Sequence, residues 1–171
     1  MENFKYIIVL FVAVLFGCKK KYPEDDKRSL KKPEKRLMEN IWVVTDYLVD
    51  GQDSSSKVYF SSIVVGGNNG NSFVFKDLQF RFKEIKDKGY DDKIIVLKSF
   101  EIKKQSELLG TGSWGLINND DNVFIKGGYG LYLFDPSAES WKIIELTKKK
   151  LSIKCLFNNK EYQLKFKKGE F

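Results

Sequence analysis

Residues 151–167, with the sequence Leu-Ser-Ile-Lys-Cys-Leu-Phe-Asn-Asn-Lys-Glu-Tyr-Gln-Leu-Lys-Phe-Lys, decide the fold class of this chain. In the second half of this stretch, Tyr162, Leu164 and Phe166 alternate with polar residues, and the first half alternates in the same way. A period of two places the apolar side chains of a β-strand on one face. The link Asn158-Asn159-Lys160 is typical of a hairpin turn. The stretch therefore predicts two antiparallel strands, each with one buried face.

Similar short segments, rich in β-branched and aromatic residues, recur along the chain and are separated by turn sequences such as Gly89-Tyr90-Asp91-Asp92. No segment shows a sustained helical period of 3.6 residues. The predicted strands cover residues 41–50, 73–83, 93–103, 108–117, 123–134, 139–147, 151–157 and 161–167. We therefore expect an all-β fold of eight strands in an antiparallel meander, which can close into an up-and-down barrel.

The first residues carry a different signal. Residues 7–16 are apolar without interruption. Ten residues in a helix span about 15 Å, half the hydrocarbon thickness of a bilayer, which suits a signal-peptide core better than a transmembrane helix. Leu15-Phe16-Gly17-Cys18 follows and resembles the lipobox of bacterial lipoproteins. This resemblance implies cleavage between Gly17 and Cys18 and a lipid on Cys18 that anchors the chain to the membrane. The alternative is an ordinary secretory signal in which Cys18 occurs by chance.

Residues 18–37 are expected to form a flexible basic tether after the signal peptide of residues 1–17. Lys19 to Lys35 contain eight basic and four acidic residues but few bulky apolar ones, so this stretch cannot bury enough surface to order itself. The chain has a net charge of +7, of which only +3 belongs to the residues from Arg36 onward. Positive charge beside a membrane can contact anionic head groups. A nucleic-acid partner is not expected, because that function needs the excess charge on the folded domain.

Three groups of residues carry a resemblance to a known family: Trp42-Val43-Val44 in the first strand, Gly112-Ser113-Trp114 in mid-chain, and Trp141 with Leu151-Ser152-Ile153 near the end. Their order is similar to that in the lipocalin-like domains of small bacterial lipoproteins. The resemblance covers residues 38–171. It implies an eight-stranded lipocalin-like barrel that can hold an apolar pocket, and it assigns no catalytic residues.

The residue types present argue against an enzyme and against a metal or cofactor site. The chain has no histidine, which removes the commonest general base and metal ligand. If Cys18 is lipidated, Cys155 has no intramolecular partner, and its place on the apolar face of a strand predicts a buried, unreactive thiol. The acidic pairs Asp91-Asp92 and Asp120-Asp121 lie in turn sequences, where aspartate is favoured for local hydrogen bonds.

Aromatic residues are the remaining candidates for a ligand site, although a packed core would use the same residue types. The candidates are Trp42, Phe80, Phe100, Trp114, Trp141 and Tyr162. We therefore predict a non-enzymatic lipoprotein of the cell envelope, anchored to the outer membrane, that binds a small apolar ligand. The alternative is a protein-interaction, structural or immunity-type module with a filled core, whose partner is an envelope protein. The sequence leaves open whether the domain faces the periplasm or the cell surface.

Overall fold

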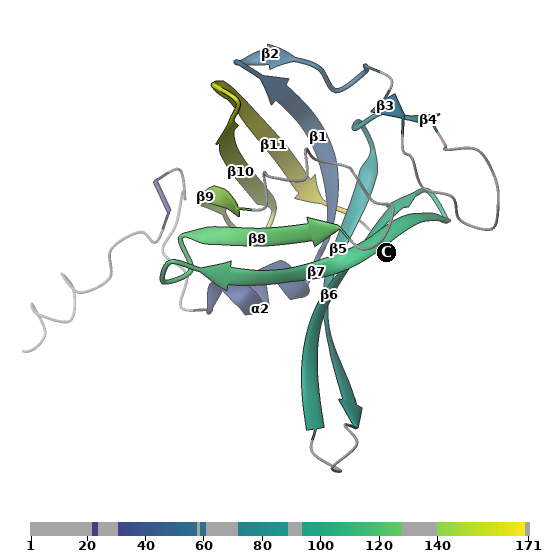
Figure 1. Cartoon of the computed structure of the whole chain (residues 1–171), viewed down its shortest axis with the longest axis vertical. Coiled ribbons are helices and arrows are strands. Elements are labelled where there is room, and N and C mark those ends of the chain that lie inside the picture. The colour runs from purple at the N-terminus through teal and green to yellow at the C-terminus, as the bar shows by residue number, and fades with distance from the viewer. Residues whose placement is uncertain are drawn as a thin grey trace, which may run out of the picture.

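The computed structural model describes residues 22–23, 31–57, 59–60, 72–88, 94–127 and 140–169. Within these ranges the fold is all-β, and the one helix is the short α2 (Pro33–Met38). Figure 1 shows the arrangement of the elements. The strands are β1 (Ile41–Val49), β2 (Gln52–Asp53), β3 (Tyr59–Phe60), β4 (Ser72–Phe73), β5 (Leu78–Lys88), β6 (Ile94–Lys104), β7 (Glu107–Ile117), β8 (Asn122–Gly127), β9 (Ser140–Leu146), β10 (Lys150–Phe157) and β11 (Lys160–Lys168). Nine of them form one antiparallel sheet in the order β11-β10-β9-β8-β7-β6-β5-β1-β2, and β3 and β4 form a separate pair.

The large sheet closes into a ring because β1 pairs with strands at both ends of the meander. One edge of β1 pairs with β5 through Ile41–Val43, and the other edge pairs with β11 from Trp42 to Val49. Strands β5 to β11 are each hydrogen-bonded to the next strand in the chain. The predicted all-β antiparallel meander is therefore confirmed. The structure adds β2, a two-residue strand beside the end of β1.

Left-handed backbone conformations make the tight turns between strands. Asn158 and Asn159 have φ angles of 48° and 60°, which form the two-residue link between β10 and β11. Asparagine tolerates this conformation better than most residues, so the predicted C-terminal hairpin is confirmed. Asp50 and Gly51, with φ angles of 51° and 78°, make the corresponding turn between β1 and β2.

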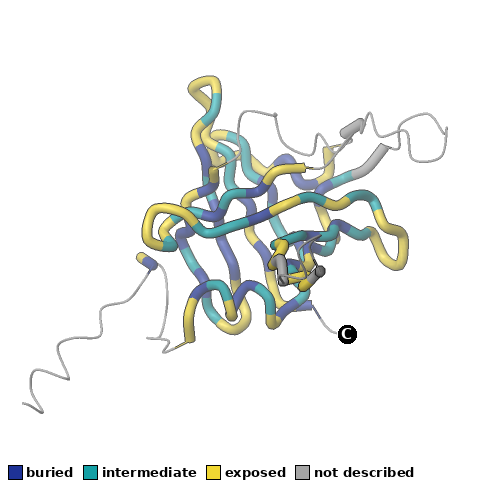
Figure 2. Tube along the Cα trace, turned by 60° about the horizontal axis from the view of Figure 1, so that its bottom comes forward, coloured by how far each residue is buried: buried dark blue, intermediate teal, exposed yellow. Residues whose placement is uncertain are grey.

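The core lies inside the ring because alternate residues of each strand point inward. Trp42 on β1, Phe80 on β5 and Phe166 on β11 are buried, whereas their neighbours Val43 and Gln79 are only partly covered. Figure 2 shows the same change between buried and exposed positions along the strands. Burial of one large apolar side chain contributes about 1.5–3 kcal/mol, so these inward rows are the main source of stability.

Helix α2 lies at one end of the ring (Figure 1). Leu37 is completely buried, and its carbonyl oxygen accepts a hydrogen bond of 2.9 Å from Nε1 of Trp42. The Arg36 guanidinium is also buried and donates to the carbonyl oxygen of Leu146 on β9. Pro33 at the first turn suits a helix start, because proline has a fixed φ and lacks an N–H that would need a partner there.

These contacts extend the folded domain N-terminal of residue 38, where the tether was expected to end. Tyr22, also in the expected tether, is buried, and its hydroxyl donates to the carbonyl oxygen of Asp120 at 2.9 Å. A helix of six residues is too short to show a periodic pattern, which explains why the sequence did not predict it. In the described part of the chain, no helix combines the length and apolar content that crossing a membrane requires.

Candidate functional site

The aromatic residues predicted to line a pocket mostly meet inside the ring. Five of them are buried and belong to one core cluster: Trp42, Phe80, Phe100, Trp114 and Trp141. The sixth, Tyr162, is only partly buried and packs against that cluster. Its ring stacks on Tyr47, with 6.4 Å between ring centroids. It lies opposite Val49 at the end of β1 that is farther from α2.

These interior side chains make direct contacts with one another. The Phe80 ring centroid lies 6.4 Å from that of Phe100 and 5.3 Å from that of Phe166, and the second pair meets edge to face. Phe82 and Trp114 also meet edge to face, at 5.2 Å. Such ring pairs are typical of closely packed cores. The observed contacts therefore fit a filled interior, and an apolar pocket stays a prediction.

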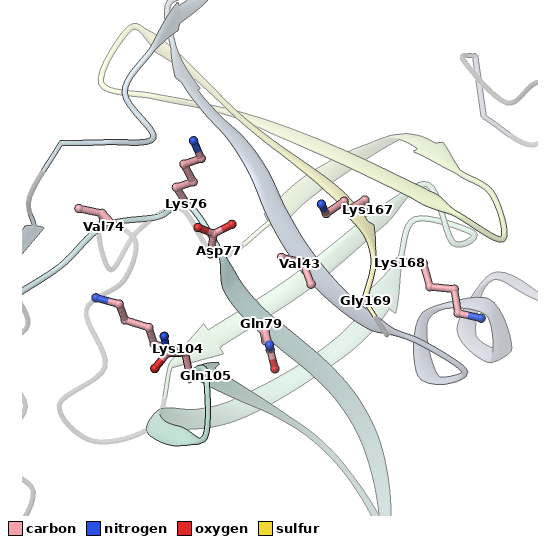
Figure 3. Close-up of a pocket in the computed structure, with 10 residues that line it drawn as sticks. All are labelled: Val43, Val74, Lys76, Asp77, Gln79, Lys104, Gln105, Lys167, Lys168 and Gly169. Atoms are coloured by element: carbon pink, nitrogen blue, oxygen red, sulfur yellow. The ribbon is translucent and has the colours of Figure 1, made fainter. Parts of the chain in front are cut away.

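A concave site of about 650 Å³ lies on the outside of the ring (Figure 3). Strands β1, β5, β6 and β11 contribute to it, together with the turns that precede β5 and follow β6. We call it the basic groove. Its lining residues are Val43, Val74, Lys76, Asp77, Gln79, Lys104, Gln105, Lys167, Lys168 and Gly169.

Neighbouring strands make the floor of the basic groove. Val43 lies opposite Gln79 of β5 and Lys167 of β11, so these three side chains form one row on the outer face. Gly169 follows β11, and its N–H donates to the carbonyl oxygen of Ile41 at 2.7 Å. A Cβ atom at Gly169 would lie only 2.9 Å from Cγ2 of Val43. Glycine therefore allows the chain to pass close to β1 at this point.

Turns make the rim of the groove. Asp77 has a φ of 68°, and its N–H donates to the carbonyl oxygen of Val44 at 3.1 Å. The N–H of Lys76 donates to the carbonyl oxygen of Ser55 at the same distance. On the other side, Gln105 has a φ of 56° in the turn between β6 and β7. These backbone constraints fix the Cα positions from which the side chains of Lys76 and Lys104 extend.

The groove is positively charged, with four lysines and one aspartate. Figure 3 shows Lys76, Lys104 and Lys167 extending from different elements around Asp77 and Gln79. Among the described residues, none of the groove lysines forms an ion pair. Hydrogen bonds from Ser55 lower the pKa of Asp53, and the charge of Lys76 lowers it further. A concave surface with unbalanced charge of one sign attracts ligands of the opposite sign.

The other candidate groups that the structure describes do not form a second site. Cys155 is buried and has no disulfide, as predicted, and burial raises the pKa of its thiol to about 12, so its lack of reactivity stays a prediction that fits its surroundings. Asp120 lies in the turn between β7 and β8, as expected, with a φ of 66°. In the described ranges, no group of three or more acidic or cysteine residues could hold a metal ion. Gly17, Cys18 and Asp91-Asp92 lie outside the described residues.

No protein-family model matches the chain, and no curated protein or solved structure matches it either. The groove must therefore be interpreted from its own chemistry.

The sequence did not predict the basic groove. Alternation in the last strand places Lys167 on the polar face, which is a partial signal. Lys76, however, lies in the turn before β5 and Lys104 at the end of β6, 28 residues apart in the sequence, and only the pairing of β5 with β6 brings them together. Alternation reveals which face a side chain occupies but not its neighbours on other strands.

Proposed function

We propose that this chain is a lipid-anchored protein of the bacterial envelope, and that its lipocalin-like barrel is a non-enzymatic binding module for an anionic ligand. The basic groove carries this proposal. It combines a concave surface with four lysines, and among the described residues no ion pair neutralises them. The close ring contacts inside the ring support the alternative of an interaction module over that of an apolar ligand carrier.

The lining suits an extended ligand with several anionic groups. A volume of about 650 Å³ is far larger than a single phosphate group needs. Lysine ammonium groups on flexible stems can adapt to separate phosphate or carboxylate groups. The amides of Gln79 and Gln105 can hydrogen-bond to hydroxyl groups, and Val43 and Val74 supply apolar contact area. An acidic oligosaccharide combines these three features.

The predicted anchor agrees with this function. A lipid on Cys18 would hold the domain at the outer membrane, where acidic and phosphorylated glycans are accessible. The basic residues between Lys19 and Lys35 would contact anionic head groups near the anchor. A domain held there would be close to a surface rich in anions.

Binding of a defined polyanion tests the proposal. The full chain in detergent would be titrated calorimetrically with an oligogalacturonate, an acidic oligosaccharide. We expect the double variant Lys104→Glu/Lys167→Glu to bind at least about tenfold more weakly, because two attractive charges become repulsive. Binding should also weaken as salt is added. The matched control is Lys142→Glu/Lys160→Glu, which changes the net charge equally at exposed positions outside the groove.

Equal losses in the two double variants would contradict a groove-specific site and indicate a general charge effect. Comparison of native and denatured masses of the chain from its natural host tests the apolar-ligand hypothesis separately. A stoichiometric apolar molecule released on denaturation would favour a pocket inside the barrel.

A further inference from the structure

Strands β5 and β6 continue beyond the ring as a two-stranded ribbon, which Figure 1 shows projecting away from the other strands. β5 pairs with β1 only through Gln79–Arg81, and β6 pairs with β7 only from Ser99 to Lys104. β5 and β6 still pair with each other as far as Lys88 and Ile94. We call residues 84–88 and 94–98 the arm. Within the described chain, neither edge of the arm has a strand partner.

The base of the arm is firmly attached to the ring. Lys98 forms an ion pair with Glu34 of α2, and its Nζ lies 5.5 Å from the centroid of the Trp114 ring. Nε1 of Trp114 donates to the carbonyl oxygen of Lys83 at 3.0 Å. These contacts attach the base of the arm to the ring, and the rest of the arm projects beyond them.

The arm exposes apolar side chains. Ile85 and Leu97 are direct cross-strand partners on one face, with 47% and 51% of their surface exposed, and Val96 on the other face is 46% exposed. A two-stranded ribbon is marginally stable in water, and an unpaired edge is a template for another strand. The unpaired edge beside this exposed apolar pair therefore marks a place where a partner strand can add to the sheet.

The charges along β5 identify a second copy of this chain as that partner. In an antiparallel pair with a two-fold axis at Ile85, Ile85 faces itself and Glu84 faces Lys86 of the other copy. By symmetry this favourable pair occurs twice, and both side chains are exposed. The β6 edge has no equivalent pair, because its only charged residue in the arm is Lys98, which already binds Glu34.

We propose that two copies of the chain associate through the β5 edges of their arms, antiparallel and with the two-fold axis at Ile85. The two arms then form a four-stranded sheet in the order β6-β5-β5-β6. A continuous apolar row then crosses this sheet, formed by Leu97 and Ile85 of one copy followed by Ile85 and Leu97 of the other. Five paired residues bury little surface, so the dimer is weak in dilute solution. Membrane anchoring would strengthen it by raising the effective concentration.

Disulfide cross-linking tests the register. In the full chain with Cys18→Ser, Ile85→Cys would place two cysteines directly opposite each other, with Cα atoms about 4.5–5.5 Å apart, which allows a disulfide. Leu97→Cys is the matched control, because it is equally exposed but would lie about 14 Å from its counterpart, three strand spacings away. We expect an oxidised dimer with Ile85→Cys only. Buried Cys155 does not interfere.

Charge exchange tests the pairing independently of disulfide formation. Lys86→Glu should weaken the dimer in sedimentation equilibrium by about tenfold, because two favourable pairs become repulsive. The exchange Glu84→Lys/Lys86→Glu restores opposite charges and should restore association. Equal cross-linking of Ile85→Cys and Leu97→Cys, no effect of Lys86→Glu, or failure of the exchange to restore the dimer would each overturn the proposal. A chain that stays monomeric at high concentration would also overturn it.

Discussion

The aromatic ring of Phe100 lies over the backbone of Gly112, its direct partner on the neighbouring strand β7. A Cβ atom at Gly112 would lie 2.5 Å from Cε1 of Phe100 and even closer to the carbonyl oxygen of Lys126 on β8. Neither the buried ring nor the paired backbone can move away easily. The absence of a side chain at Gly112 thus allows Phe100 to complete the core where β6, β7 and β8 meet.

We expect Gly112→Ala to lower the free energy of unfolding by about 1–3 kcal/mol, the usual cost of overpacking a core. Gly115→Ala is the matched control on the same strand, since a Cβ there meets nothing within 4 Å. The control should change stability by no more than about 1 kcal/mol. Urea unfolding of the three proteins provides the measurement. If the two variants unfold at the same urea concentration, close packing at Gly112 is not the reason for its glycine.

Arg36 connects α2 to the ring and to the segment before the helix. Its guanidinium donates to the carbonyl oxygen of Leu146 and lies 5.5 Å from the centroid of the Tyr22 ring. We expect Arg36→Ala to destabilise the domain by about 1–3 kcal/mol, because the buried carbonyl loses a hydrogen bond. Trypsin should also cleave the bond between Lys21 and Tyr22 faster. Lys35→Ala, at an exposed neighbouring position, should change neither property, and an equal response in this control would argue against the role of Arg36.

The C-terminal hairpin was predictable because its information is local. Apolar residues alternate along both strands, and Asn158 and Asn159 occupy the turn between them. The closure of the ring was harder to predict from the sequence. Val43 meets Gln79 on one side and Lys167 on the other, and no local pattern encodes a pairing over such sequence distances.

The same limit applies to the arm and to α2. The strand predicted to end at Lys83 continues to Lys88 because its backbone pairs with β6, although the residues after Lys83 include only one apolar side chain. Leu37 is one buried leucine in a charged stretch, so its contribution to the core has no sequence signature. Because the prediction rested on composition alone, it placed the residues of this packed helix in the flexible tether.

The predicted anchor depends on the Cys18 thiol, which accepts the lipid in the lipoprotein interpretation. Cys18→Ser should therefore abolish labelling of the chain with a radioactive or alkyne-tagged fatty acid in its host. Cys155→Ser should leave labelling unchanged, because that thiol is buried in the folded domain. Labelling that persists in Cys18→Ser would contradict the anchor and favour an ordinary secretory signal.

Cys155 gives the domain a stability that depends on pH in alkaline solution. Burial raises the pKa of its thiol from the ordinary value of 9.0 to about 12. Between these two values the unfolded chain has lost a proton that the folded chain still holds, so the free energy of unfolding falls as the pH rises. Below about pH 9 the thiol is protonated in both states and contributes no pH dependence.

We therefore expect the wild-type protein to lose more stability than Cys155→Ala when the pH is raised from about 8 to about 10.5. All other titratable groups are shared by both proteins, so the difference between the two slopes isolates the thiol. Chemical denaturation at a series of pH values measures both slopes. Iodoacetamide should modify Cys155 only in denaturant, because the folded domain presents a buried, neutral thiol. Parallel slopes, together with rapid modification of the folded protein, would mean that solvent reaches this side chain between β9 and β11.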